Sequence, residues 1–352
     1  MTLNLRSKKR GIRSAQLVCA AWLGVSALFL AGCQSSVTAE TGDLPIGISS
    51  ASLEDPFQAA LQTAVSQAAT SEGIDIVSAT NANNDPSKQL TDINAIVGSG
   101  AKGMLIVPRD TSAVVPAIKE ATAAGVPVVA LDSTPTGGDA VITVRADSTQ
   151  MGELACEQIG EALNGTGKVL ELQGDLATTV GRERTDGFEQ CMSERFPGIQ
   201  VIAKNTQWKA DLAANLAQTT LTATPDIGAI YLESDSVMLS GVLAVMKQLG
   251  RLVPAGQEGH IVIATIDGTP DALDAVRTGE VDVVISQPLP DYAKYGLMHL
   301  KNAIEGVKPE VGATSYGSRI VESDGQLEDL LPAVVVTSDN VNEDTLWGNS
   351  DG

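Results

Sequence analysis

Two polar residues follow consecutive apolar runs in the second half of the chain. Residues 261–266 form a continuous β-branched run typical of a strand buried on both faces, and this run ends at Asp267. After a turn and a short predicted helix, a second run at 281–285 leads to Gln287. Ligands of open α/β sheets bind beyond the carboxyl ends of the strands. We therefore expect Asp267 and Gln287 to face one crevice, where a carboxylate accepts and an amide both donates and accepts hydrogen bonds.

Apolar runs and helical segments alternate over most of the chain. Strands are predicted at 44–49, 74–78, 103–107, 125–131, 168–172, 199–203, 227–232, 261–266 and 281–285. A single helix between successive strands implies parallel pairing with right-handed crossovers. The fold class is therefore α/β, and two series of similar size, divided near 146, predict two similar lobes. An acidic tail with one strand-like run, 333–336, follows the last helix.

Composition and motifs narrow the classes of function. The formal net charge of −20 over 352 residues argues against a nucleic-acid partner. His260 and His299 are the only histidines, and neither belongs to a nucleophile motif. Neither a Gly-x-Ser-x-Gly motif nor a glycine-rich phosphate loop is present, and no Cys/His spacing suits zinc. The sequence therefore predicts no enzyme, no metal site and no cofactor.

Residues 1–32 have the features of a secretory signal. A basic cluster that ends at Arg13 precedes an apolar stretch too short for a settled transmembrane helix. The stretch ends in Leu-Ala-Gly before Cys33, which resembles the bacterial lipobox, so we expect Cys33 to carry a lipid and 33–43 to form a tether. The alternative is a plain cleaved signal with an incidental cysteine. Either way, the protein is predicted to be exported, and in the first case to be anchored to the outer face of the cell membrane or held in the periplasm.

Two further cysteines, Cys156 and Cys191, lie on predicted helices of the second series. An oxidising compartment favours a disulfide between them. Two buried free thiols are the alternative.

Several passages together resemble the type I periplasmic solute-binding proteins, and most closely the ribose-binding branch of sugar-binding lipoproteins. The passages occur in family order over about 44–306, at residues 55–57, 125–132, 181–188, 266–270 and 285–287. The resemblance implies two doubly wound parallel-sheet lobes joined by a three-strand hinge, with the ligand in the cleft between them.

The domain boundaries implied by the resemblance follow the family. Residues 44–145 and 291–311 would form the first lobe, 146–290 and 312–340 the second, and 341–352 a tail. The three crossings between the lobes would fall near 146, 287–290 and 312.

The resemblance also carries ligand contacts to particular positions. They are Asp55, Phe57, Asp132, Arg182, Trp208, Ser234, Asp267 and Gln287. Arg109 is added on grounds of charge. Carboxylates, amides and guanidinium groups bridge vicinal hydroxyls, and an aromatic face covers the apolar side of a sugar ring.

Departures from the family pattern widen the range of ligands. Gln58, Val107 and Ile266 stand where the family has a second aromatic, a polar strand end and another aromatic. The cleft would offer fewer aromatic rings for stacking on a sugar and be more acidic, so pentoses, hexoses, polyols and an amino-substituted cyclitol are all candidates.

The resemblance implies a monomeric binding protein that delivers its solute to an ABC permease. The alternatives are a sensor that presents the solute to a membrane receptor and a secreted enzyme.

Overall fold

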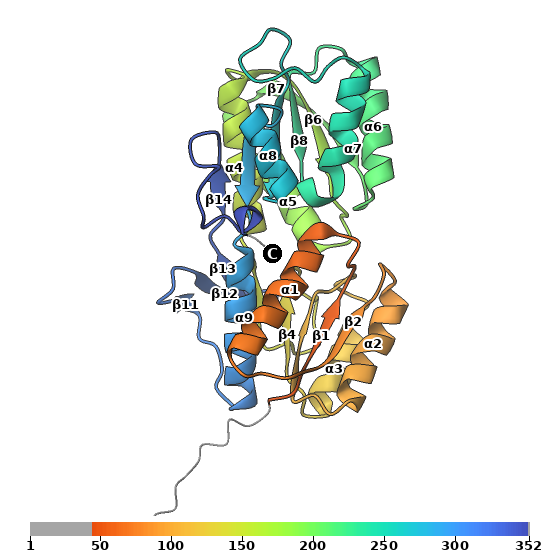
Figure 1. Ribbon diagram of the computed structural model, residues 1–352, viewed down its shortest axis with the longest axis vertical. Coiled ribbons are helices and arrows are strands. Elements are labelled where there is room, and N and C mark those ends of the chain that lie inside the picture. Colours follow the sequence, from red (N-terminus) through yellow and green to blue (C-terminus); the bar gives the residue numbers. More distant parts are fainter. Residues whose placement is uncertain (1–43, 351–352) are drawn as a thin grey trace, which may run out of the picture. The chain divides into compact units, whose positions relative to one another are not determined.

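The computed structural model describes residues 44–350 (Figure 1). The predicted signal, Cys33 and the tether lie outside these residues. The described chain contains two sheets, each covered by helices. Across 44–350, no helix combines the length and apolarity that a membrane crossing requires.

The first lobe is an eight-stranded sheet with four helices. Its strand order is β11-β12-β13-β5-β4-β3-β1-β2, with β1 to β5 parallel to one another. The strands are β1 (Ile46–Ser50), β2 (Ile76–Asn81), β3 (Gly103–Ile106), β4 (Val128–Leu131), β5 (Thr143–Ala146), β11 (Gly312–Ala313), β12 (Arg319–Ser323) and β13 (Gln326–Leu331). The helices are α1 (Pro56–Ser71), α2 (Pro86–Gly98), α3 (Val115–Ala123) and α9 (Leu289–Ile304).

The second lobe is a six-stranded sheet with five α-helices in the described chain. Its order is β14-β10-β9-β8-β6-β7, parallel except for the edge strand β14. The strands are β6 (Thr166–Gln173), β7 (Gly198–Asn205), β8 (Ala229–Leu232), β9 (Val262–Asp267), β10 (Val283–Ser286) and β14 (Val334–Val336). The helices are α4 (Ser148–Ala162), α5 (Thr179–Arg195), α6 (Ala210–Ala223), α7 (Asp235–Gln248) and α8 (Pro270–Thr278), with a 3₁₀ turn η1 (Trp347–Asn349).

Alternate residues of the central strands enter different cores, which explains their uninterrupted apolar runs. In β3, Met104 packs in the core with α2 and α3, whereas Leu105 packs in the core with α1 and α9. In β8, Ile230 and Leu232 point to the core under α6, α7 and α8, and Tyr231 packs on the opposite face against Phe188 of α5 at 4.4 Å between ring centroids. Both sheets therefore have helices on both faces.

Residues 312–331 belong to the first lobe, so their predicted place in the second lobe is wrong. Strand β13 pairs in parallel with β5, and β11, β12 and β13 extend that sheet as antiparallel neighbours. Within 44–350 the chain passes between the sheets after β5, after β10 and after β13, so the third crossing lies at 332–333 and not near 312. Strands β12 and β13 mix charged, polar and apolar residues and lack a long apolar run, so the sequence did not distinguish them from the rest of the acidic tail.

The described part of the predicted tail, 341–350, is also packed. Val341 and Leu346 are buried in the core of the second lobe, and Trp347 is 9 % exposed. The Trp347 indole N–H donates to the backbone oxygen of Asp267 at 2.8 Å. The end of the chain therefore supports the strand end on which the candidate site is built.

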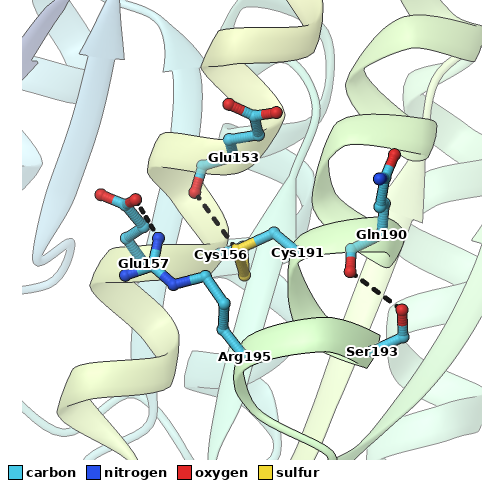
Figure 2. Close-up of a disulfide and its surroundings, with 7 residues drawn as sticks. All are labelled: Glu153, Cys156, Glu157, Gln190, Cys191, Ser193 and Arg195. Carbon is cyan, nitrogen blue, oxygen red and sulfur yellow. Dashed lines mark hydrogen bonds and ion pairs between the residues drawn. A yellow bond between two sulfur atoms is a disulfide. The ribbon is translucent and has the colours of Figure 1, made fainter.

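The disulfide predicted between Cys156 and Cys191 is present and joins α4 to α5 (Figure 2). Cys156 is fully buried and Cys191 nearly so. Arg195, one turn beyond Cys191, forms an ion pair with Glu157 of α4. The covalent bond and the ion pair fix the two helices on one face of the second sheet.

Candidate binding cleft

A cavity of about 330 Å³ lies at the carboxyl ends of strands from both lobes. The first lobe contributes the loops after β1, β2, β3 and β4, and the second lobe the segments that follow β6, β7, β8, β9 and β10. The polar and aromatic lining includes Glu54, Asp55, Phe57, Gln58, Asn84, Arg109, Asp132, Ser133, Thr178, Arg184, Trp208, Lys209, Asp211, Ser234, Ser236, Asp267 and Gln287. The volume lies near the lower end of small-molecule sites, which run from roughly 300 to 1,000 Å³.

Asp267 is the centre of a hydrogen-bond network on the second-lobe side. Its Oδ2 accepts from the hydroxyls of Ser234 at 2.6 Å and Ser236 at 2.9 Å, and its Oδ1 accepts from Gln287 Nε2 at 2.7 Å. Asp267 is 2 % exposed and is the last residue of β9. The crevice position predicted for Asp267 and Gln287 is therefore the one they occupy.

The backbone around Asp267 is held in an unusual conformation. Asp267 has φ of 122°, a region that residues with a Cβ rarely adopt. The carboxylate of Asp235 accepts from the amides of Gly268 (2.8 Å) and Thr269 (3.2 Å) and from the Thr269 hydroxyl (2.6 Å). These three bonds fix the turn before α8 and so aim the Asp267 side chain.

Asp55 faces Asp267 from the first lobe. Its Oδ1 caps α1 by accepting from Phe57 N at 3.0 Å and lies 2.8 Å from the Ser236 hydroxyl of the second lobe. Burial, together with the nearby Asp267 carboxylate, raises the pKa of Asp55 to about 7. The same carboxylate thus serves as a helix cap and as a wall of the cleft.

Asp132 follows β4 and has a positive φ of 67°. Burial raises the pKa of Asp132 to about 6, although the Arg184 guanidinium opposes the shift. Across residues 44–350, its carboxylate accepts no hydrogen bond from the protein. Its acceptor capacity is therefore available to a molecule in the cavity.

The arginine of the cleft is Arg184, so the prediction of Arg182 is wrong. Arg182 is exposed on the outer face of α5 and donates to the backbone oxygen of Leu176. Arg184 is 3 % exposed, donates to the backbone oxygen of Glu233 at 2.6 Å and lies 3.7 Å from Asp267 Oδ1. Two residues span about 200° of an α-helix, which places these two arginines on opposite faces.

Trp208 covers one side of the cavity. Its indole N–H donates to Thr178 Oγ1 at 3.2 Å, and its ring packs against the backbone of Gly174. A Cβ at position 174 would lie 2.0 Å from Trp208 Cη2, so only glycine admits the ring there. The Arg184 guanidinium lies 5.9 Å from the ring centroid.

Phe57 is buried at the base of the cleft. Its ring makes edge contacts with Tyr292 at 6.1 Å and Trp347 at 6.0 Å between centroids. It therefore lines the cavity, as the resemblance implied, and also anchors α1 in the core.

Direct contacts hold the two lobes together across the cleft. Arg109 pairs with Asp175 at 3.4 Å, and the Thr179 hydroxyl donates to the backbone oxygen of Thr134 at 3.1 Å. Behind the cavity, Arg145 of β5 bonds to Glu183 of α5 at 2.9 Å. Arg109, added on charge, thus lines the cavity and also bridges the lobes.

Gln287 connects the cleft to two crossings between the lobes. Its Oε1 accepts from the Tyr292 hydroxyl at 2.7 Å, and that hydroxyl accepts from the backbone N–H of Ala146 at 2.7 Å. Its Nε2 donates to Asp267. One chain of hydrogen bonds therefore runs from the crossing after β5, through the crossing after β10, to Asp267.

The structure brings eight of the nine predicted ligand residues to one cavity and excludes Arg182. The lining residues that the sequence analysis missed include Arg184, Ser236 and Lys209. Ser236 lies two residues after the predicted Ser234, in the first turn of α7, and nothing in its local sequence distinguishes it from a helix-capping serine. In the described part of the chain, no three His, Cys, Asp or Glu side chains group as a metal site.

Residues 46–308 match the model of the periplasmic binding protein domain family. Among curated proteins, the ribose import binding protein of Salmonella typhimurium is 31% identical over 239 residues, covering 68% of this chain and 77% of that protein. The xylitol-binding protein of Mycolicibacterium smegmatis is 28% identical over 202 residues, covering 57% of this chain and 55% of that protein. A solved ABC transporter solute-binding protein from Mycobacterium smegmatis, with bound glycerol, superposes with a TM-score of 0.74 at 26% identity, covering 87% of this chain and 99% of that one.

Proposed function

We propose that this chain, which belongs to the periplasmic binding protein family, captures a sugar or polyol in the cleft between its lobes. The relatives named above are solute-binding proteins and not enzymes. The observation that carries the proposal is the meeting of Asp55, Asp132, Asp267 and Gln287 at strand ends around one cavity. Carboxylate and amide groups that approach the cavity from several sides can form hydrogen bonds with a sugar ring or polyol chain, whose hydroxyls point in several directions.

Trp208 supports the same class of ligand. Its ring lines the cavity and is fixed by Thr178 and Gly174, so an apolar sugar face could stack on it without further ordering of the side chain. The named relatives bind ribose or xylitol, and the solved relative holds glycerol. Each of these is small enough for a cavity of about 330 Å³.

The proposal extends to the surroundings of the protein. The signal-like residues 1–32 and the lipobox-like residues before Cys33 support export and attachment by an N-terminal lipid. The names of the relatives, an import binding protein and an ABC transporter solute-binding protein, support delivery of the bound solute to an ABC permease. We propose that the protein acts as a monomer.

A thermal-shift screen of the purified protein against sugars, polyols and cyclitols tests the proposal. A ligand present at 100 times its dissociation constant adds about 2.7 kcal/mol to the free energy of unfolding, which raises the transition temperature. The ligands that shift the transition are then tested against Asp267→Ala, and we expect that shift to disappear. Asp271→Ala, an exposed carboxylate in the first turn of α8, is the matched control and keeps the shift.

Two results would contradict the proposal. One is a transition that no sugar, polyol or cyclitol moves while an amino acid or nucleoside does. The other is a folded Asp267→Ala variant whose transition shifts as much as that of the unmodified protein, which would remove Asp267 from the site.

A further inference from the structure

The innermost part of the cleft has more negative than positive groups. Asp55 lines it from the N-terminus of α1, and Asp132 and Asp267 line it from the ends of β4 and β9. Arg184 is the one buried cation among them in the described chain. Nearer the rim, Glu54 and Asp211 add carboxylates while Arg109 and Lys209 add cations. The lining therefore has five carboxylates and three cationic side chains.

The three cations have protein partners. Arg184 donates to the Glu233 backbone and lies nearest Asp267, at 3.7 Å. Arg109 lies 3.4 Å from Asp175, outside the lining. Lys209 is exposed and bonds to the side chain of Gln207 at 3.0 Å. Within residues 44–350, neither Asp55 nor Asp132 has a cationic nitrogen within 4.0 Å.

The contact between the lobes shows the same shortage of positive charge. The Ser236 hydroxyl lies 2.8 Å from Asp55 Oδ1 and 2.9 Å from Asp267 Oδ2. A hydroxyl has one proton and can donate to only one carboxylate at a time. The second short contact therefore needs a proton on one of the carboxyl groups, in agreement with the raised pKa of Asp55, which is about 7. With the lobes closed, a proton takes the place of a counter-cation.

From this geometry we propose that the ligand bears an amino group, as an amino sugar or an aminocyclitol, and that its ammonium is bound by Asp55 and Asp132. The inference rests on the proposed function and specifies its substrate class. An ammonium offers three donors and a charge. It satisfies the Asp132 carboxylate, which accepts no protein hydrogen bond in the described chain, and replaces the proton at Asp55. A neutral polyol would supply the donors but no positive charge to offset the two carboxylates near Asp267, of which Asp132 has only the more distant Arg184 and Arg145 as counter-charges.

Matched pairs of ligands test this inference. Isothermal titration at pH 7 compares glucosamine with glucose, galactosamine with galactose, and scyllo-inosamine with scyllo-inositol. In each pair that binds, we expect the amine to bind about fivefold or more tightly, since charge-assisted hydrogen bonds exceed neutral ones by about 1 kcal/mol or more. Repeating the titration at pH 6, where the amines are protonated and Asp55 largely so, in buffers of different ionisation enthalpy should show proton release on amine binding, because Asp55 loses its proton.

Variants separate the role of the cleft carboxylates from the charge of the whole molecule. We expect Asp55→Asn and Asp132→Asn each to bring the affinity ratio of amine to alcohol toward one. Asp186→Asn removes the same charge from the outer face of α5, where Asp186 is exposed, and should keep the ratio.

The outcomes distinguish this inference from the function on which it rests. If the neutral member of each pair binds as tightly as the amine, or if the two cleft variants keep the original ratio, the ligand is a neutral sugar or polyol and the inference fails alone. If no amine and no neutral sugar or polyol binds, the proposed function fails and the inference fails with it.

Discussion

At the residue scale, the position of one side chain around a helix separates a binding residue from a surface residue. Arg182 and Arg184 share the chemistry that suggested a ligand contact, but only Arg184 belongs to the buried face of α5. That face includes Gly181 and Phe188, so the apolar pattern of the helix indicates the correct arginine once the helix is phased on it.

The two arginines form a matched pair for mutation. We expect Arg184→Gln to weaken binding of the ligand found in the screen by roughly tenfold or more, because a buried cation next to Asp267 is lost. Arg182→Gln should change the dissociation constant by less than about twofold. Isothermal titration measures both values, and circular dichroism checks that each variant is folded. Equal losses in the two variants would contradict the assignment of Arg184.

Other residues of the cleft could be predicted from the sequence because they follow apolar strands. Asp132 and Asp267 each come directly after a run of four buried residues, so the sequence indicated their place at a strand end. Ser236 was not, since its role depends on an approach of Asp55 from the other lobe, 181 residues away along the chain. Contacts across such distances depend on tertiary structure and leave no local pattern.

At the scale of the elements, the disulfide ties α4 to α5 away from the cavity. Its half-cystines are 35 residues apart. We expect the double variant Cys156→Ala, Cys191→Ala to lower the free energy of unfolding by about 3 to 4 kcal/mol, because the unfolded chain regains the freedom that the cross-link removed. Urea unfolding measures the loss, and ligand affinity should stay within about twofold. A reductant should destabilise the unmodified protein but not the double variant; equal effects on both would contradict the prediction.

Glu233, directly after β8, couples the stability of the second lobe to pH. Its carboxylate is fully buried and accepts from Gly174 N at 2.7 Å and the Thr185 hydroxyl at 2.6 Å. Burial raises its pKa from 4.5 to about 7, although these hydrogen bonds oppose the shift. Glu171 and Glu189 add negative groups nearby, and Arg184 adds a positive one. Between these two pKa values the folded protein binds a proton that the unfolded chain has released, so this contribution to stability decreases as pH rises through that window.

Glu233→Gln tests this linkage. An amide keeps both contacts, since its oxygen can accept from Gly174 and its NH₂ can donate to Thr185, but it does not titrate. We expect the melting temperature of the unliganded variant to fall less steeply than that of the unmodified protein between pH 5 and 8. Glu194→Gln, an exposed carboxylate of α5, should leave the slope unchanged. Parallel curves for Glu233→Gln and the unmodified protein would show that Glu233 contributes nothing to the dependence.

The elements that the sequence predicted are those with continuous apolar runs. Strand β5 was not predicted, because the charged Arg145 interrupts it, and that charge is balanced in the fold by Glu183 and Glu328. Strands β12 and β13 mix charged and apolar residues without regular alternation or a long apolar run, so their pattern resembled an acidic tail. Their assignment depends on pairing with β5, which is a tertiary contact.

At the scale of the whole molecule, closure of the lobes and the arrangement of the cleft share hydrogen bonds. Tyr292 of α9 accepts from Ala146 and donates to Gln287, which in turn holds Asp267. Tyr292 is fully buried and does not line the cavity. It can therefore affect binding only through the conformations of the chain that it supports.

We expect Tyr292→Phe to weaken binding by roughly three- to tenfold, because the two hydrogen bonds of the hydroxyl, which join Ala146 to Gln287 across the lobes, are lost. Small-angle scattering of the unliganded variant should show a larger radius of gyration than that of the unmodified protein. The matched control is Tyr231→Phe, since the buried Tyr231 hydroxyl has no partner in the described chain. A Tyr292→Phe variant with unchanged affinity and radius would remove this residue from the closure equilibrium.

The hydrogen bonds of Tyr292 allow the affinity of this protein to change separately from its specificity. A change that shifts only the population of closed molecules multiplies every dissociation constant by the same factor, whichever solute is bound. Changes at Asp55 or Asp132 alter the ratios between solutes. Substitutions behind the cleft can therefore change the solute concentration at which the protein is half-occupied, whereas residues inside the cleft determine which solute binds. A lineage could thus adapt to a scarcer or richer supply of one nutrient without altering its preference.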